Sequence, residues 1–503
     1  MKNYSIKNLF LSSIAFSLLF ISCADYVDVN NDLNNPQVSQ LKPDNLLASA
    51  TSDLATLQNV TMNQLGNIMT AGWSANATDF NSPFRAEFQY DMTPSFYENI
   101  WTNIYLKTNN YSHIEKYEDG QNWDNHKAIA KILKTFYLQY VVDLYGDAPF
   151  SEIHQGAQIL FPKYDDDMQI YRSLVQNLDD AVALINNTNA STVRPISSED
   201  IVFAGNMQNW KRFANTIKLR LLLRQSLLTD GATVAYLTSE FNELTTSGAQ
   251  FITANVVANP GYINTDGKQN PFYASYGRDP QGNTVSANNL VGPSKYYADL
   301  LKGVIPGTLL YDPRINQQYK ARSTSNPAII GVPQGASSGR TSRLGAGVLI
   351  NSNQNSYVML AAESYLLQAE AVERGYLTGS AQGLFNSGIT SSFATLGLTG
   401  TVVSNYIASS SGTSRIGWGA GNNIEAIITQ KWIANNSING IESWVEYTRT
   451  GFPSNLPLPL VTTQTSRPNR LLYPSSEISG NSNNVPPQTS SSAFTTKVFW
   501  DAN

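Results

Sequence analysis

The stretch NHKAIAKILKTFYLQYVVDLYGDAP (125–149) limits most strongly what this chain can fold into. Its apolar residues recur at alternating steps of three and one, through Ile129, Ile132, Leu133, Phe136, Tyr137, Tyr140, Val141 and Leu144. This spacing places them on one broad face of a helix, which ends near Gly146 and Pro149. Such a face has to be buried against another element, so packed helices are expected to dominate the fold.

Helical periodicity divides the chain into two blocks. It dominates residues 41–228 and returns at 357–377, 381–393 and 422–450, so the second helical block spans 357–450. Between the blocks, residues 230–350 are dense in Gly, Asn, Pro and Tyr without a sustained period, which predicts a loop-rich insert with few short strands. Residues 451–503 form a Pro-, Ser- and Asn-rich irregular tail. We therefore expect a mainly α fold with an irregular lobe, in which residues 41–503 form a single domain.

The composition restricts the classes of ligand. Only 14% of the 503 residues are charged and the net charge is −5, whereas nucleic-acid binders need a basic surface. A polar, weakly charged surface with 26 Tyr and 8 Trp favours neutral hydrogen-bonding ligands such as sugars or peptides. His113, His126 and His154 lack metal-ligand spacing, and one cysteine excludes a disulfide framework, so we expect neither a metal nor a cofactor. The triplet Asp165–Asp167 is expected to cap a helix, with a divalent cation as the alternative.

The only cysteine lies at the end of the N-terminal apolar run. Lys2 and Lys7 precede apolar residues 9–21, the pattern of a signal peptide over residues 1–22, which is too short to span a bilayer. LLFISC (18–23) resembles the bacterial lipobox, so Cys23 is the predicted lipid anchor and residues 23–40 its solvated tether. The alternative is an ordinary secreted protein with an incidental cysteine.

Several motifs in order resemble the SusD/RagB family of Bacteroidetes outer-membrane lipoproteins. They include AESYLLQAEAVERGYL (362–377), IITQKWIANNSINGIESWVEYTRTGFP (427–453) and RLLYPSSEISGNSNNV (470–485). The resemblance implies tetratricopeptide-like helical hairpins and an irregular lobe with little β structure. It also implies a nutrient-binding lipoprotein on the outer face of the outer membrane, held there by acylated Cys23. Such a protein captures oligosaccharide or peptide and acts as the lid of a SusC-like TonB-dependent transporter, without catalysing a reaction.

Two aperiodic segments combine aromatic and hydrogen-bonding side chains, as binding sites for sugars and peptides do. The candidates in the first segment (71–101) are Trp73, Phe80, Phe84, Arg85 and Tyr90, and those in the second (270–279) are Tyr273, Tyr276 and Arg278. We expect Trp73 or Tyr90 to stack on the ligand. The alternative is that these aromatic residues only pin the loops to the helical core. Four other tryptophans lie on apolar helical faces and are expected in the core: Trp101, Trp210, Trp432 and Trp444.

Two other functions fit the composition or the helical pattern. A glycoside hydrolase of helical fold would need paired carboxylates, but no spacing singles out an acid and a base. Glu363, Glu370 and Glu373 share one helical stretch, where a packing or inter-helix hydrogen-bonding role is expected. A scaffold that binds only protein through its helical repeats is the second alternative, against which the long aromatic loops argue.

Overall fold

The structure is a computed structural model that describes residues 41–503 except residue 326. Residues 43–503 form one compact unit. Cys23, the predicted signal peptide and the predicted tether lie outside the described residues.

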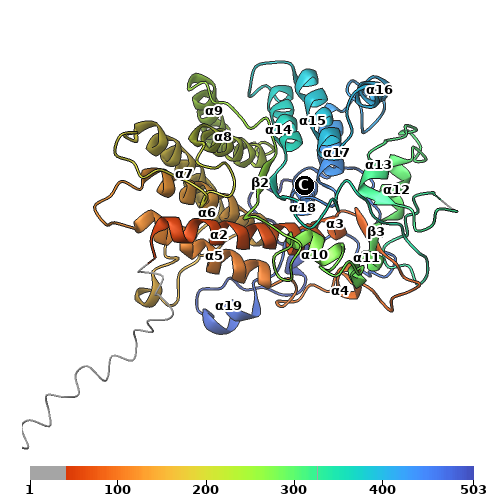
Figure 1. The fold of residues 1–503 in the computed structure, drawn as a ribbon, viewed down its shortest axis with the longest axis horizontal. Coiled ribbons are helices and arrows are strands. Elements are labelled where there is room, and N and C mark those ends of the chain that lie inside the picture. The colour runs from red at the N-terminus through yellow and green to blue at the C-terminus, as the bar shows by residue number, and fades with distance from the viewer. Residues whose placement is uncertain (1–40, 326) are drawn as a thin grey trace, which may run out of the picture. The chain divides into compact units, whose positions relative to one another are not determined.

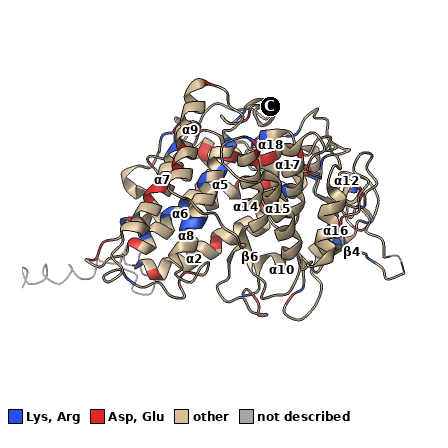
Figure 2. Cartoon of the chain, turned by 90° about the horizontal axis from the view of Figure 1, so that it is seen from above, with Lys and Arg blue, Asp and Glu red and all other residues tan. Residues whose placement is uncertain are grey.

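The first group of helices confirms the mainly α prediction (Figure 1). Along the chain, α2 packs against α5, α5 against α6, α6 against α7 and α7 against α8. Every residue of the apolar face that the sequence predicted for 125–149 is buried on α6. Figure 2 shows acidic and basic residues interspersed along these helices. The elements are α2 (Pro43–Leu57), the π-helical turn η2 (Gln58–Met62), α3 (Asn63–Met69), α5 (Asn99–Lys116), α6 (Asp124–Tyr145), α7 (Asp167–Asn187), α8 (Met207–Arg224) and α9 (Gly231–Thr246).

The second group of helices follows the predicted order but differs in its boundaries. It comprises α14 (Ala361–Glu373), α15 (Ala381–Thr395), α16 (Thr401–Ser410), α17 (Asn423–Asn435) and α18 (Gly440–Thr450). The pattern over 422–450 predicted one helix, but residues 436–439 are not helical and separate α17 from α18. After this interruption, α18 packs against both α3 and α17. The pattern over 357–377 begins as strand β6 (Ser356–Met359), and α16 was not predicted.

The irregular lobe holds short elements only. The six strands of the described residues pair into three two-stranded antiparallel sheets: β1 (Trp73–Ala75) with β3 (Val291–Pro293), β2 (Val256–Ala258) with β6, and β4 (Tyr319–Lys320) with β5 (Arg343–Leu344). The predicted insert 230–350 needs one correction, because its first part forms the helix α9. The remaining short helices are α4 (Arg85–Gln89), η3 (Gly156–Gln158), α10 (Pro271–Tyr276), α11 (Ser286–Leu290), α12 (Lys295–Leu301), α13 (Ile315–Gln318), α19 (Ser475–Gly480) and α20 (Ser492–Thr495).

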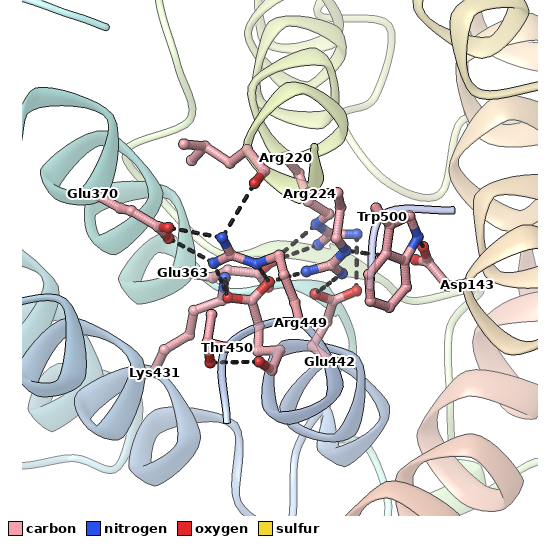
Figure 3. Close-up of polar contacts among 12 residues, drawn as sticks. Asp143, Arg220, Arg224, Glu363, Glu370, Lys431, Glu442, Arg449, Thr450 and Trp500 are labelled. Atoms are coloured by element: carbon pink, nitrogen blue, oxygen red, sulfur yellow. Dashed lines mark hydrogen bonds and ion pairs between the residues drawn. The ribbon is translucent and has the colours of Figure 1, made fainter. Parts of the chain in front are cut away.

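A buried ionic network joins the two groups of helices (Figure 3). Arg220 of α8 lies 2.7 Å from Glu363 of α14, and Arg224 of α8 lies 2.7 Å from Glu442 of α18. Arg449 of α18 pairs with Glu370 of α14 at 2.8 Å. All six side chains are at most 1% exposed. Each of these six charges has an opposite charge beside it, so the network links α8, α14 and α18 without leaving any of the six unpaired.

The network accounts for two of the three glutamates that resembled catalytic candidates. Both Glu363 and Glu370 are fully buried and paired with arginine, as their predicted inter-helix role requires. Glu373 accepts a hydrogen bond from Asn423 of α17 at 2.9 Å. All three carboxylates therefore link α14 to neighbouring helices.

Candidate functional site

A groove of about 730 Å³ lies beside the loop that connects β1 to α4. One wall is formed by residues 74–89, and the other by residues 333–337 together with Val461. The lining mixes aromatic or apolar side chains with hydroxyl, amide and charged ones: Phe80, Pro83, Phe88, Thr78, Asp79, Asn81, Ser82, Arg85, Gln89 and Ser337. This combination matches the apolar faces and polar edges of a sugar ring.

Hydrogen bonds within and between the two loops fix both walls of the groove. The fully buried Asn76 accepts hydrogen bonds at Oδ1 from the backbone N–H groups of Thr78 and Asp79, at 3.2 and 3.3 Å, and donates from Nδ2 to Asp79 at 2.8 Å. The backbone N–H of Ala77 donates to the carbonyl of Gly339 at 3.0 Å. The Gly339 N–H in turn donates to Oγ1 of Thr78 at 2.9 Å. The two loops are therefore joined before any ligand binds.

The segment around α4, from which Arg85, Phe88 and Gln89 line the groove, carries backbone strain. The five-residue helix α4 is flanked by Phe84 (φ 50°) and Tyr90 (φ 56°), and Ser82 has φ 46°. Positive φ is unfavourable for non-glycine residues, particularly for bulky ones, and persists only where the surrounding contacts enforce it. Here Phe84 packs against the core and contacts Phe88 edge to face at 5.9 Å. The strained turns present α4 to the groove.

Phe80 and Arg85 are the predicted candidates that line the groove. Phe80 is half-buried, so part of its ring is free to contact a ligand. Arg85 is exposed and donates from Nε to Gln89 at 3.2 Å. Beside them, the hydrogen bond from Asn76 and the ion pair with Arg340 lower the pKa of Asp79. The groove thus offers an aromatic face beside charged donors and acceptors.

Trp73 and Tyr90 do not reach the groove, which corrects the stacking prediction. Trp73 is 0% exposed, donates from Nε1 to Oγ of Ser437 at 2.8 Å and contacts Tyr276 edge to face at 5.4 Å. Tyr90 is 2% exposed, and burial raises its pKa to about 12. Both rings are occupied by core contacts, so the alternative that aromatic residues pin the loop applies to them and to Phe84.

The second predicted segment does not line the groove. Tyr276 is 3% exposed and donates from its hydroxyl to Oε1 of Gln64 at 2.8 Å. Tyr273 is half-buried on the short helix α10. Arg278 is exposed and donates to the carbonyl of Gly282 at 2.6 Å. Of the eight predicted candidates, the structure places Phe80 and Arg85 on the groove, and the facing loop 333–337 was not among the predicted segments.

Within the acidic triplet, Asp166 caps α7 as the sequence predicted, whereas Asp165 binds a neighbouring loop. Asp166 is the N-cap and accepts from the backbone N–H of Gln169 at 3.0 Å, while Asp165 accepts from that of Ser151 at 2.7 Å. Carboxylate oxygens of Asp147, Asp166 and Asp167 lie within 4.8 Å of one another, and burial raises the pKa of Asp167 to about 6. These three side chains are the ones that would hold the alternative cation.

The four tryptophans that were predicted in the core are all buried: Trp101, Trp210, Trp432 and Trp444. In the part of the chain that the structure describes, no helix combines the length and the apolar character needed to cross a bilayer.

Comparison with known proteins identifies the family and the fold. Residues 34–474 match the SusD-like_2 family, described as starch-binding and associating with the outer membrane. A chitin-binding SusD homologue from Flavobacterium johnsoniae is 24% identical with a TM-score of 0.72, over 92% of this chain and 97% of that chain.

Further solved structures agree with this assignment, although no curated protein sequence matches the chain significantly. A SusD homologue from Bacteroides uniformis is 24% identical with a TM-score of 0.70, over 91% of this chain and 99% of that chain. A SusD-like protein from Bacteroides thetaiotaomicron is 19% identical with a TM-score of 0.72, over 92% and 99% of the two chains. The chain therefore belongs to the SusD-like family and has the family's fold.

Proposed function

We propose that this chain binds carbohydrate in the groove between residues 74–89 and 333–337. The family is described as starch-binding, and one structural relative is a chitin-binding SusD homologue. The observation that carries the proposal is the groove itself, in which the half-buried Phe80 lies among amide, hydroxyl and charged side chains.

The chemistry of the groove suits a sugar chain. The ring of Phe80 stacks on the apolar face of one sugar residue, which contributes about 1 kcal/mol beyond the area that is buried. Gln89, Asn81 and Ser337 provide amide and hydroxyl groups for the ring hydroxyls of the sugar. Since the two loops are already joined through Gly339, little conformational entropy is lost when the ligand binds.

We further propose that the protein is a cell-surface lipoprotein that delivers its ligand to a SusC-like TonB-dependent transporter and acts as its lid. The lipobox-like LLFISC (18–23) and the family's association with the outer membrane support this role. Cys23→Ala should move the protein out of the outer-membrane fraction. Affinity purification of the wild type from cell envelopes should co-purify a TonB-dependent barrel. Unchanged fractionation of the variant argues against the anchor, and the absence of a barrel argues against the lid.

Calorimetric titration of the purified full-length protein with chitohexaose and maltoheptaose tests carbohydrate binding. Phe80→Ala should weaken binding of the recognised sugar about fivefold, the equivalent of about 1 kcal/mol. Phe161→Ala is the matched control, because Phe161 is 63% exposed and lies outside the groove. Equal affinities of the two variants, with both folded by circular dichroism, would exclude Phe80 from the site.

A further inference from the structure

A second hollow, of about 590 Å³, adjoins the groove. Asp79 and Phe80 line both spaces, so a ligand that stacks on Phe80 extends directly into the second one. We call this second space the arginine hollow, because Arg322, Arg340 and Arg343 line it. Resting on the proposed carbohydrate function, we propose that the arginine hollow binds an anionic group, carboxylate or sulfate, of an acidic oligosaccharide whose neighbouring sugar lies on Phe80.

The charge of the arginine hollow is not balanced by the protein. Of the described residues that line it, three are arginines and Asp79 is the one carboxylate. Asp79 pairs with Arg340 at 2.8 Å. Arg322 donates to backbone carbonyls, from NH2 to Asn289 at 2.6 Å and from Nε to Thr341. Arg322 and Arg343 therefore form no close ion pair within the described part of the chain, and Asp79 is the one carboxylate shared by all three guanidinium groups.

Arg343 is the member of the arginine hollow that has an unsatisfied donor. Its Nε is buried and has no acceptor within the described residues. On the β4–β5 pair, Arg343 lies directly opposite Lys320, and like charges in that position destabilise a sheet. An unsatisfied buried donor on a charged group is costly, and an anion in the hollow would supply the missing acceptor.

The pKa shifts of Arg322 and Lys320 also indicate an excess of positive charge around Arg343. Burial and the repulsion from Arg343 lower the pKa of Arg322, although Asp79 opposes the shift. Burial, followed by the charges of Arg343 and Arg278, lowers the pKa of Lys320. By contrast, Arg449 in the helical core lies against Glu370 at 2.8 Å. The positive potential of the arginine hollow is therefore a local feature of a chain whose net charge is −5.

The choice of probe distinguishes a carboxylate ligand from a sulfate ligand. Calorimetry on the full-length protein compares chitohexaose and maltoheptaose, which are neutral, with hexagalacturonate, which carries carboxylates, and a κ-carrageenan hexasaccharide, which carries sulfates. We expect one acidic probe to bind at least about tenfold more tightly than either neutral one, a ratio that charge-assisted hydrogen bonds supply. The preference should decrease as salt is raised, because the hollow is open to solvent.

Arg343→Met is the test variant, since the buried Nε of Arg343 has no hydrogen-bond acceptor among the described residues. It should remove most of the preference for the acidic probe and leave any neutral binding unchanged. Arg212→Met is the control, because the side chain of Arg212 on α8 donates to Gln250 and to no other residue in the described part of the chain. Circular dichroism verifies that both variants are folded.

The outcomes separate the two proposals. Acidic binding that weakens in Arg343→Met supports the anion site. An acidic probe that binds no better than the neutral ones, or equally well to wild type and Arg343→Met, overturns it. If neutral oligosaccharide still binds and depends on Phe80, the groove proposal stands. If none of the four probes binds, both proposals fail.

Discussion

Replacing Arg449 with methionine tests whether the buried ionic network stabilises the packing of the helices. The guanidinium is 0% exposed and donates to both oxygens of Glu370, at 2.8 and 2.9 Å, and to Glu446 at 2.6 Å. It also donates to the carbonyl of Leu223 on α8 at 3.1 Å. Methionine fills similar space but provides none of these donors.

The expected loss follows from what remains around the two carboxylates. Breaking a buried ion pair from one side typically costs about 3–5 kcal/mol, because a charge is left without its partner. Glu370 keeps Arg374 at 2.8 Å, and Glu446 keeps Lys431 at 3.4 Å. Neither carboxylate is wholly unpaired, so we expect the lower part of that range, about 3 kcal/mol.

Urea denaturation, monitored by tryptophan fluorescence, measures the free energy of unfolding without adding salt that would screen the charges. Arg212→Met on the surface of α8 should change it by less than about 0.5 kcal/mol. In the double variant Arg449→Met with Glu370→Gln, removal of one unpaired charge should recover part of the loss. A loss below about 1 kcal/mol for Arg449→Met would refute the reasoning, because the network would then contribute little beyond packing.

Two further predictions concern helix packing and pH. Gly66→Ala places a Cβ against the carbonyl of Gly440, where α3 packs against α18. This variant should reduce the free energy of unfolding by about 3 kcal/mol. In the same urea assay, Gly231→Ala should change the free energy of unfolding little, because its Cβ meets no atom within 4 Å. Burial raises the pKa of Asp143 to about 6, above its unfolded value of about 3.9, so its protonated form favours folding. The contribution of Asp143 to stability should therefore be greatest below about pH 4 and decline by up to about 3 kcal/mol as the pH rises through 6. Measured against Asp143→Asn across pH 4–8, a difference that does not change with pH would contradict the shifted pKa.

The sequence by itself determined the helices with the clearest apolar spacing, and their buried faces. The apolar spacing on α6 and the N-cap Asp166 of α7 act within a few residues, so local order along the chain contains the information. The same reasoning placed Trp101 in the core, where it is 3% exposed. The motifs of the second helical block also indicated the family that the comparison identifies.

Helix boundaries and the candidate site depended on tertiary contacts. The break between α17 and α18 interrupts an apolar pattern that continues through it. Trp73 is buried because its indole reaches Ser437, 364 residues further along the chain. Likewise, the facing wall of the groove is positioned by Gly339, which bonds to Ala77 and Thr78.

The difference between the helices, which the sequence predicted, and the candidate site, which it predicted only in part, has a physical reason. Helical periodicity and capping involve residues at most four positions apart, so both can be recognised in a single sequence. Whether an aromatic ring in an aperiodic segment faces a ligand or the core depends on which distant segment folds over it. In this chain, that choice buried Trp73 and Tyr90 and left Phe80 at the edge of the groove.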